Sequence, residues 1–156
     1  MGVETERKFL VQSEAWRAAA RQSLGLRQGY LAIDGGTTVR VRTDGKEARV
    51  TIKGATLGLS RPEFEYVVPL RDGEELLALC RGRLVEKVRH RVPVGAHIWE
   101  IDEFQGANQG LLIAELELSD PDEPFARPEW LGAEVSEDPR YLNANLSIRP
   151  YGQWSE

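Results

Sequence analysis

Charged residues recur at every second position in seven separate stretches of this sequence. The first stretch carries Glu4, Glu6 and Lys8, and apolar residues follow at Phe9 and Leu10. Side chains two positions apart in a β-strand project from the same face of that strand. The pattern therefore predicts a chain built mainly of strands, in which one face of each strand is charged and the other is apolar.

The same period of two continues to the end of the sequence. The charged rows are Glu4, Glu6 and Lys8; Arg40 and Arg42; Lys53; Arg61, Glu63 and Glu65; Lys87, Arg89 and Arg91; Glu100 and Asp102; and Glu115 and Glu117. An eighth stretch around Tyr30 also has strand character, but its two faces are less distinct. Strands of this kind, joined by short turns, predict a largely antiparallel sheet.

Helical spacing and turn residues divide the rest of the chain. We expect strands at 3–11, 27–33, 37–43, 47–54, 61–70, 84–92, 96–104 and 111–119. Ser13 and Asp72 are candidate caps for helices over 13–24 and 72–80, and Asp138-Pro139 can begin a short last helix. Residues 121–132 contain three prolines and are expected to form a loop. This order of elements indicates the α+β class.

Two interpretations of the charged rows compete. In the more ordinary one, the charged rows face water and the apolar rows face the core of a one-sided sheet. However, the rows hold almost no uncharged polar residues, and like charges lie together, as at Arg40, Arg42 and Lys53. Such neighbours repel each other unless an opposite charge lies between them. In the second interpretation, the rows line a closed barrel, where carboxylates bind divalent metals and basic groups bind a polyanion.

Composition limits the classes of function. The 156 residues are 41% hydrophobic and 29% charged, which suits one domain spanning 1–156. A net charge of -5 argues against a nucleic-acid partner, so any anion site must be a local concentration of basic groups. No apolar run approaches the roughly 20 residues of a membrane helix. Because Cys80 is the single cysteine, no intramolecular disulfide can form, and we expect a cytoplasmic protein.

The order of these motifs resembles that of the CYTH superfamily, the triphosphate tunnel metalloenzymes. The resemblance covers nearly the whole chain, from Val3 to about Leu146. The motifs are Glu4-x-Glu6-x-Lys8, Arg40-x-Arg42, Thr51-x-Lys53, Ser60-Arg61-x-Glu63-x-Glu65, Glu86-Lys87-x-Arg89, Glu100-x-Asp102 and Glu115-x-Glu117. The resemblance implies a closed eight-stranded antiparallel β-barrel with a charged lumen and flanking helices, which binds a small triphosphate together with Mg2+ or Mn2+.

The resemblance also implies roles for individual residues. The phosphate oxygens would be held by Lys8, Arg40, Arg42, Lys53, Lys87 and Arg89, with Arg61 and Arg91 as less certain lining residues. The acidic, metal-binding set would be Glu4, Glu6, Glu63, Glu65, Glu115 and Glu117, with Asp102 as a further metal-binding or water-positioning group.

Two further regions carry an open choice. Tyr30 resembles a tyrosine at the tunnel edge of short bacterial members and is a candidate catalytic residue, but it could equally belong to the core. The segment with Asp138, Arg140, Tyr141 and Asn143 resembles a helix that can plug one tunnel mouth, which makes Arg140 a candidate substrate contact. Tyr141 and Leu146 could instead simply pack on the barrel.

The expected activity is hydrolysis of inorganic tripolyphosphate to pyrophosphate and phosphate. The chain is short, and nothing in it indicates a purine pocket. Arg27-Gln28-Gly29 before Tyr30 also resembles small bacterial tripolyphosphatases. The alternatives are an adenylate cyclase of the same superfamily, a thiamine triphosphatase and a non-catalytic nucleotide or polyphosphate sensor. No Ser-His-Asp or Cys-His set is visible, so we expect no covalent intermediate. Apolar faces beyond the reach of the helices suggest a homodimer.

Overall fold

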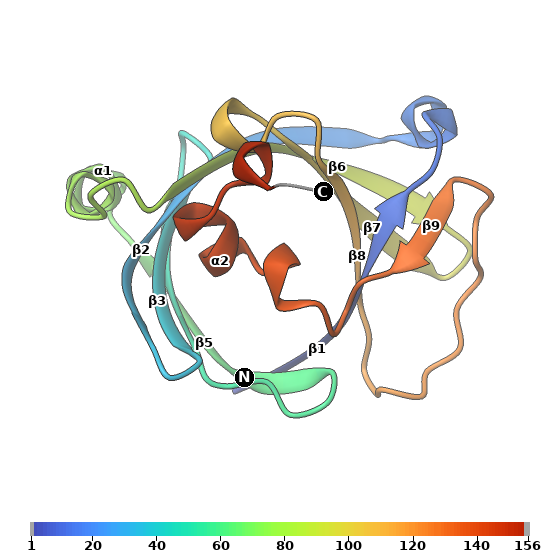
Figure 1. Cartoon of the computed structure of the whole chain (residues 1–156), viewed down its shortest axis with the longest axis horizontal. Coiled ribbons are helices and arrows are strands. Elements are labelled where there is room, and N and C mark those ends of the chain that lie inside the picture. Colours follow the sequence, from blue (N-terminus) through green and yellow to red (C-terminus); the bar gives the residue numbers. More distant parts are fainter. Residues whose placement is uncertain (1, 155–156) are drawn as a thin grey trace.

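Nine strands follow one another through the 2–154 segment that the computed structural model describes (Figure 1). They are β1 (Val3–Val11), β2 (Gln22–Asp34), β3 (Thr37–Thr43), β4 (Ala48–Lys53), β5 (Ser60–Val68), β6 (Leu84–Val94), β7 (His97–Phe104), β8 (Leu112–Glu117) and β9 (Leu131–Glu134). Met1, Ser155 and Glu156, at the ends of the predicted domain, lie outside the described residues.

Antiparallel pairing closes eight of these strands into a barrel. The order is β5-β4-β3-β2-β6-β7-β8-β1, and β1 pairs again with β5, where Glu4 lies opposite Arg61. The short β9 pairs with β1 on the outside of this circle, with Phe9 opposite Glu134. The predicted α+β class and the closed eight-stranded antiparallel barrel with flanking helices are therefore confirmed.

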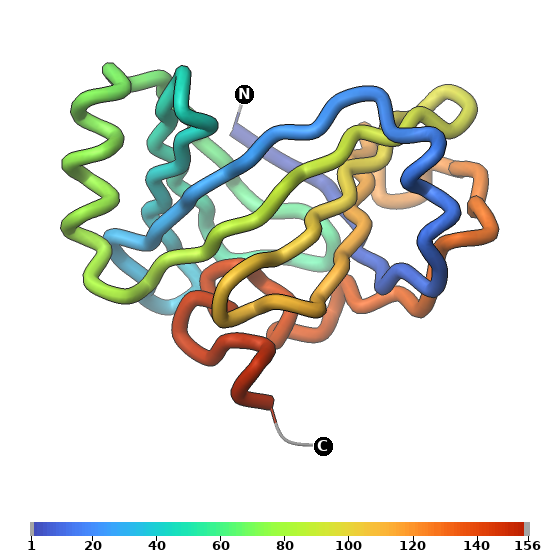
Figure 2. Tube along the Cα trace, turned by 90° about the horizontal axis from the view of Figure 1, so that it is seen from above, coloured from blue at the N-terminus to red at the C-terminus, as the bar shows by residue number. Residues whose placement is uncertain are grey.

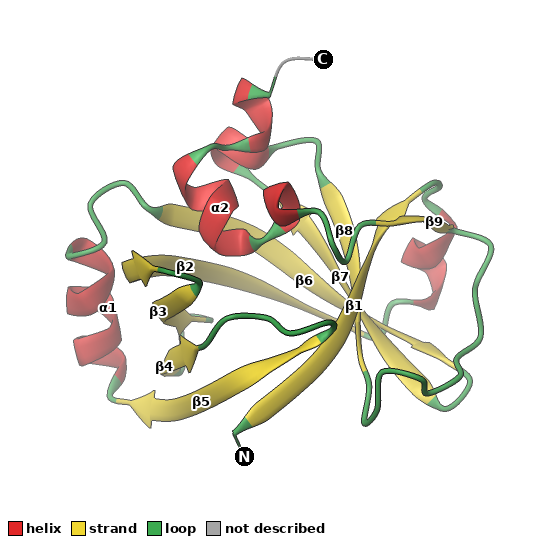
Figure 3. Cartoon of the chain, turned by 60° about the horizontal axis from the view of Figure 1, so that its bottom comes forward, coloured by secondary structure: helices red, strands yellow, loops and turns green. Residues whose placement is uncertain are grey.

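Short helices cover the sides and one end of the barrel. The α-helices are α1 (Leu70–Ala78) and α2 (Asn143–Ile148), and the 3-10 turns are η1 (Ala15–Ala19), η2 (Gly106–Asn108), η3 (Pro139–Tyr141) and η4 (Tyr151–Gln153). Figure 2 shows α1 and η1 on opposite sides of the barrel. The C-terminal segment with α2 lies over one mouth (Figure 3). Within residues 2–154, no helix has the length and apolar character needed to span a membrane.

The apolar rows face outward and are covered by these peripheral elements. The largest cluster includes Phe9, Trp16, Trp99 and Leu116, and the segment with Trp130 packs over it. On the other side, α1 covers the outer face of β3 and β4. The strands therefore bury apolar side chains on their outer surface, which is the reverse of an ordinary one-sided sheet.

A third cluster closes the interior at the α2 end. Val85, Phe104 and Ile113 follow the parity of the inward-facing charged rows, but they are apolar. Tyr141 and Leu146 from the C-terminal segment pack against them. The lumen is consequently charged in its middle and apolar beneath the C-terminal segment.

The predicted helix over 13–24 is wrong. Only Ala15–Ala19 form a 3-10 turn, and the strand β2 begins at Gln22. Leu24 and Gly25 lie opposite Arg89 and Val88 of β6. The helical spacing of Trp16 and its neighbours was real, but the residues from Gln22 onward pair with β6, whereas a short helix gains little stability by itself.

Two smaller differences from the expectations are a helix cap and an unforeseen strand. Asp72 does not cap the second helix, because α1 begins at Leu70 directly after Pro69 and contains Asp72 in its first turn. The prolines of 121–132 do form a loop, but the chain returns as β9, a strand that the sequence did not indicate. Its four residues are too few for a recognisable alternation.

We expect Gly73→Ala to destabilise the fold although alanine favours helices. Gly73 is buried in α1, and a methyl group there would collide with Ala48 of β4. Overpacking costs about 1–3 kcal/mol, whereas the gain in helix propensity is at most ~1 kcal/mol. Urea unfolding should therefore show a lower free energy for Gly73→Ala. The exposed Glu75→Ala in the same helix should change it by under ~0.5 kcal/mol; an equally stable Gly73→Ala protein would contradict the packing.

Candidate active site

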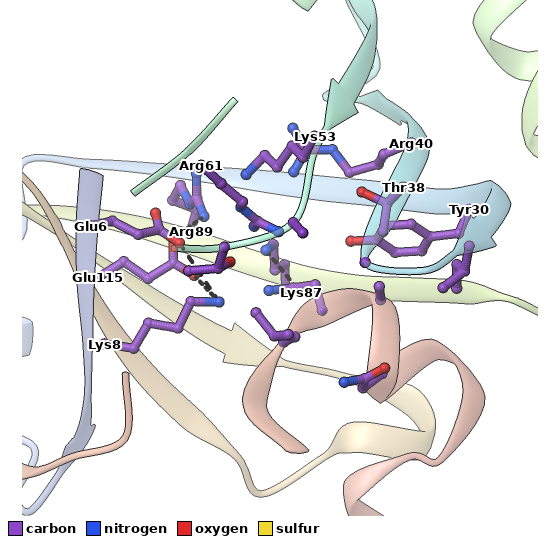
Figure 4. A pocket seen from close by; sticks show the side chains of 18 residues that line it. Glu6, Lys8, Tyr30, Thr38, Arg40, Lys53, Arg61, Lys87, Arg89 and Glu115 are labelled. Carbon is purple, nitrogen blue, oxygen red and sulfur yellow. Dashed lines mark hydrogen bonds and ion pairs between the residues drawn. The ribbon is translucent and has the colours of Figure 1, made fainter. Parts of the chain in front are cut away.

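The barrel encloses a cavity of about 370 Å³, and eight of the 18 residues that line it are charged (Figure 4). Nine of the predicted site residues line it, namely Glu6, Lys8, Tyr30, Arg40, Lys53, Arg61, Lys87, Arg89 and Glu115. They come from seven different strands, which the closure of the sheet brings around one space. The C-terminal segment adds residues 142–145 to the wall. The structure thus supports the interpretation in which the charged rows face inward.

Asp102 is the most enclosed charge in the barrel. Its side chain has no exposed surface, and its oxygens lie 2.8 Å from Lys87 Nζ and 2.8 Å from Arg89 Nε. Burial alone would raise the pKa of Asp102, but Arg89 and Lys87 outweigh it and hold that pKa far below its usual value. Burial also lowers the pKa of Lys87 to about 8, against the opposing effect of Asp102. Asp102 is therefore placed as the counterion of two basic residues.

Glu4 plays a similar part at another place in the wall. Its carboxylate accepts hydrogen bonds from Lys53 Nζ at 3.0 and 3.1 Å and from Arg61 Nε at 2.9 Å. Burial raises the pKa of Glu4, yet Lys53 and Arg61 bring it to about 2. Lys53 also lies 3.5 Å from Glu63. These contacts hold Lys53 and Arg61 at the cavity, while Glu4 itself borders a small adjoining hollow rather than the cavity.

Glu6 and Glu115 are the two carboxylates of the cavity wall itself. Lys8 Nζ lies 3.7 Å from an oxygen of each, and Arg89 Nη2 lies 3.3 Å from Glu115. Burial and the nearby Glu115 raise the pKa of Glu6 to about 7, against the opposing effect of Lys8. Burial and the neighbouring carboxylate therefore both disfavour the charged form of Glu6 in the protein alone.

The same position suits a divalent cation by the chemistry of its donors. Glu6 lies opposite Glu117 on the neighbouring strand, and Lys8 lies opposite Glu115. Carboxylate oxygens are the ligands that hard cations such as Mg2+ and Mn2+ prefer. No three acidic, histidine or cysteine side chains within residues 2–154 already converge as a metal site. These carboxylates are suitable ligands for a hard cation, and the ammonium group of Lys8 lies between Glu6 and Glu115.

The end of the barrel opposite α2 carries a second charged hollow, of about 290 Å³. Its wall holds four arginines and four acidic residues, namely Arg42, Arg49, Arg89, Arg91, Asp44, Glu47, Glu65 and Glu100. In the described part of the chain, Arg42 has no carboxylate oxygen within 4.0 Å. Burial, together with Arg40 and Arg89, lowers the pKa of Arg42 to about 10. An anion beside Arg42 would relieve this unfavourable concentration of positive charge.

The remaining predicted residues lie outside the cavity wall. Glu65 is held by Arg49 at 2.8 Å and by Thr51 at 2.9 Å. Glu117 is exposed. Arg140 lies at the surface, where its guanidinium is 2.8 Å from Asp138, and it borders a separate hollow.

Several polar residues at or beside the cavity were not among the predicted site residues, including Thr56 and Asn145 in its wall. Thr38 and Asn143 line the wall, and Gln28 and Thr51 are fully buried beside it. Gln28 shares the strand parity of Tyr30, and Thr38 that of Arg40, so the period of two could have identified both. Asn143 lies on α2, and no strand periodicity could have placed it there.

We expect Asp102→Asn to cost about 3 kcal/mol of unfolding free energy at pH 7, because Lys87 and Arg89 lose a buried counterion. The folded-state pKa of Asp102 lies below its unfolded value of about 3.9. The stabilisation is therefore complete above pH ~5 and is lost as the pH falls towards the folded-state pKa. Urea unfolding at pH 7, 5 and 3 measures the free energy of unfolding of the unsubstituted protein and of Asp102→Asn. The difference between these two free energies should be equal at pH 7 and 5 and smaller at pH 3.

The exposed Asp122→Asn serves as a matched control and should stay within ~0.5 kcal/mol of the unsubstituted protein at each pH. Equal stability of the Asp102→Asn and unsubstituted proteins at pH 7 would show that Asp102 is not the counterion described.

Comparison with known proteins places this site in a family. The model of the CYTH domain matches residues 2–151. The inorganic triphosphatase of Acetivibrio thermocellus is 43% identical over 157 residues, which cover all of both chains. The inorganic triphosphatase of Nitrosomonas europaea is 37% identical over 150 residues, covering 93% of this chain and 97% of that one.

Solved structures agree with this assignment. The crystal structure of the inorganic triphosphatase NE1496 is similar with a TM-score of 0.65 and 33% identity, covering 95% of this chain and 96% of that chain. A putative adenylyl cyclase from Hippeastrum, described as having a dominant triphosphatase activity, shares only the fold, at 13% identity and a TM-score of 0.57 over 78% of this chain and 81% of its own. The CYTH triphosphate tunnel metalloenzymes are metal-dependent. The sequence motifs, the charged tunnel and the full-length matches lead to one conclusion: the chain belongs to the CYTH family.

Proposed function

We propose that this protein hydrolyses inorganic tripolyphosphate to pyrophosphate and phosphate, with Mg2+ or Mn2+ as its metal. The observation that carries the proposal is the convergence of six basic side chains on one cavity of about 370 Å³ in an otherwise acidic protein. That volume lies near the lower end of the roughly 300–1,000 Å³ of ligand pockets. A compact, highly charged anion suits such a space. The full-length similarity to two proteins named inorganic triphosphatase supports the same substrate.

The basic residues would hold the phosphate chain from several sides. Lys8 approaches from β1, Arg40 from β3, and Lys87 and Arg89 from β6, while Lys53 and Arg61 are held in place by Glu4. Arginine can bind two phosphate oxygens at once, whereas lysine acts as a compact charge. Because ion pairs already fix these side chains, little conformational freedom is lost when the substrate binds.

The metal would be held by Glu6 and Glu115, with Glu117 on the facing strand as a further donor. When bound, it would neutralise charge on the phosphate oxygens and lower the pKa of a coordinated water. Lys8 already pairs with both cavity carboxylates, so it lies where substrate and metal would meet. Glu4 and Asp102 act as counterions for the phosphate-binding residues rather than as donors at the cavity surface.

The reaction itself needs little covalent chemistry from the protein. Water attacks the terminal phosphorus, the bond to the bridging oxygen breaks, and that oxygen leaves as part of pyrophosphate. The basic residues stabilise the charge that moves onto the phosphoryl oxygens, and a carboxylate of the row orients the attacking water. Cys80, the single thiol, is buried under α1 outside the barrel and takes no part.

An adenylate cyclase remains the second candidate because it would use the same phosphate-binding residues. Residues 142–145 occupy one end of the cavity and reduce the room for a nucleoside there. The other mouth is lined mainly by charged side chains rather than by a flat apolar surface for a purine. These features favour a substrate that consists of phosphate alone.

The remaining proposals concern the whole molecule. We propose one domain over 1–156 and a cytoplasmic location, the latter supported by the single, buried cysteine. A homodimer is supported by the outer face of β1, β4 and β5, where Val3, Ile52, Phe64 and Tyr66 are exposed. Light scattering of the purified protein measures its mass in solution, and a monomer at all concentrations would contradict the dimer.

Incubation of the purified protein with tripolyphosphate and Mg2+ or Mn2+ should release phosphate and pyrophosphate in equal amounts. ATP and thiamine triphosphate, tested in parallel, should be turned over more slowly, and ATP should yield no cyclic AMP. Ion chromatography of the products distinguishes these outcomes. Cyclic AMP with pyrophosphate would favour the cyclase. Metal-dependent binding without turnover of any triphosphate would favour the sensor.

We expect Glu115→Gln to lower kcat for tripolyphosphate at least ~100-fold, because it removes the negative charge of a proposed metal ligand that lies between Lys8 and Arg89. The fold should survive, since Arg89 keeps its bonds to Asp102. Steady-state kinetics and circular dichroism measure the two effects. Glu86→Gln, exposed on the outside of β6, should retain full activity. Full activity in a folded Glu115→Gln protein would refute the metal assignment.

A further inference from the structure

A chain of hydrogen bonds links the C-terminal helix to Tyr30. Lys87 Nζ donates to Asn143 Oδ1 at 2.9 Å. Gln28 Nε2 donates to the same oxygen at 3.4 Å and to the Tyr30 hydroxyl at 3.1 Å. Gln28 is fully buried, and Tyr30 is only 4% exposed. The four residues therefore form a connected, enclosed set that spans β2, β6 and α2.

The direction of every bond in this chain is fixed by the lysine. An ammonium group can only donate, so Asn143 must present its carbonyl oxygen to Lys87. That oxygen can only accept, so Gln28 must turn its amide nitrogen towards Asn143. The opposite orientation of Gln28 would place two carbonyl oxygens against each other. Gln28 Oε1 is left buried without a partner, which is the cost of this orientation.

The Tyr30 hydroxyl consequently accepts from Gln28 and keeps its own hydrogen for another partner. Within residues 2–154, that hydroxyl makes no hydrogen bond other than the one from Gln28. The charged groups that face it are the basic residues Arg40, Lys8 and Arg61 from β3, β1 and β5. Figure 4 shows the hydroxyl of Tyr30 directed towards the middle of the cavity. Burial raises the pKa of Tyr30, so the hydroxyl stays protonated at neutral pH.

We propose that Gln28 and Asn143 are positioning residues that fix the Tyr30 hydroxyl as a hydrogen-bond donor to a phosphoryl oxygen of the substrate. The inference rests on the proposed triphosphatase function. The receiving oxygen is one that gains negative charge as the phosphoanhydride bond breaks. A donor already aimed at that charge accelerates the reaction, because it needs no reorientation. Tyr30 keeps its proton throughout and acts as a donor rather than as a base.

The proposal gives the C-terminal segment a part in the reaction. Asn143 lies on α2, which is anchored over the barrel mouth by Leu146. Removal of the side-chain carbonyl of Asn143 would free the Gln28 amide to turn over, and its oxygen could then accept the hydroxyl hydrogen of Tyr30. The donor would then point away from the substrate, although Tyr30 itself would be unchanged.

A double-mutant cycle on kcat for tripolyphosphate tests this coupling. Tyr30→Phe should lower kcat ~100-fold, as loss of a single transition-state donor does. Gln28→Met, which keeps the size of the side chain, should lower kcat about tenfold with KM changed less than ~3-fold. Adding Gln28→Met to Tyr30→Phe should have no further effect, since both changes remove one interaction. Independent, multiplicative effects, or full kcat in Tyr30→Phe, would overturn the proposal.

Asn143 offers a conservative rescue. Asn143→Asp keeps an acceptor for Lys87 and Gln28, so kcat should stay within ~3-fold even if added charge raises KM. Asn143→Leu removes the acceptor and should lower kcat about as much as Gln28→Met. Equal kcat values in the Asp and Leu variants would contradict a positioning role, because packing alone would then explain both. Thermal unfolding confirms that each protein is folded.

A titration independent of turnover separates this proposal from the proposed function. Ultraviolet absorbance follows the formation of tyrosine phenolate as the pH rises. Subtracting the titration curve of Tyr30→Phe from that of the unsubstituted protein leaves the contribution of Tyr30. The hydrogen bond from Gln28 stabilises the phenolate and lowers the pKa, so Gln28→Met should raise the pKa of Tyr30 further. An unchanged pKa would overturn the hydrogen-bond chain. If the unsubstituted protein fails to hydrolyse tripolyphosphate but the titration shifts, the proposed function is wrong and the orientation of Tyr30 stands.

Discussion

The pairing of Asp102 with Lys87 and Arg89 makes a charged barrel interior stable. A buried charge without a partner is costly, and a barrel lined by basic residues alone would not tolerate its own repulsion. Asp102 offsets two of these residues, and Glu4 offsets Lys53 and Arg61 in the same way. Neither counterion lines the main cavity, whereas the four basic groups that they neutralise all do.

A charged interior also dictates what surrounds the barrel. Because strand side chains alternate, inward charges force apolar residues outward along the same strands. Those residues must then be covered from outside, which α1 does on one side and η1, β9 and the segment around Trp130 do on the other. The α+β architecture is thus a consequence of the chemistry of the lumen. The C-terminal segment completes it by closing one mouth with apolar contacts around Leu146.

Local patterns predicted the strands better than the helices. The alternation of charged and apolar residues identified the barrel strands, because it lies within each strand and does not depend on which other strand pairs with it. The spacing around Trp16 indicated a helix up to Leu24, but β6 offered those residues a strand partner. The short β9 was not foreseen, because it depends on pairing with β1, which is about 120 residues earlier in the sequence.

The sequence by itself determined which side chains share a face of each strand. That face could still have been turned to water, and only the resemblance of the motif order to the CYTH superfamily implied that the charged rows line a barrel. Only the tertiary structure decided how those charges divide. Glu4 and Asp102 became counterions, while Glu6 and Glu115 reached the cavity surface. Periodicity along one strand cannot determine this, because each role depends on which basic residue a carboxylate meets across strands. Asn143 reaches Lys87 for the same reason: residues distant in the sequence meet only when the chain closes on itself.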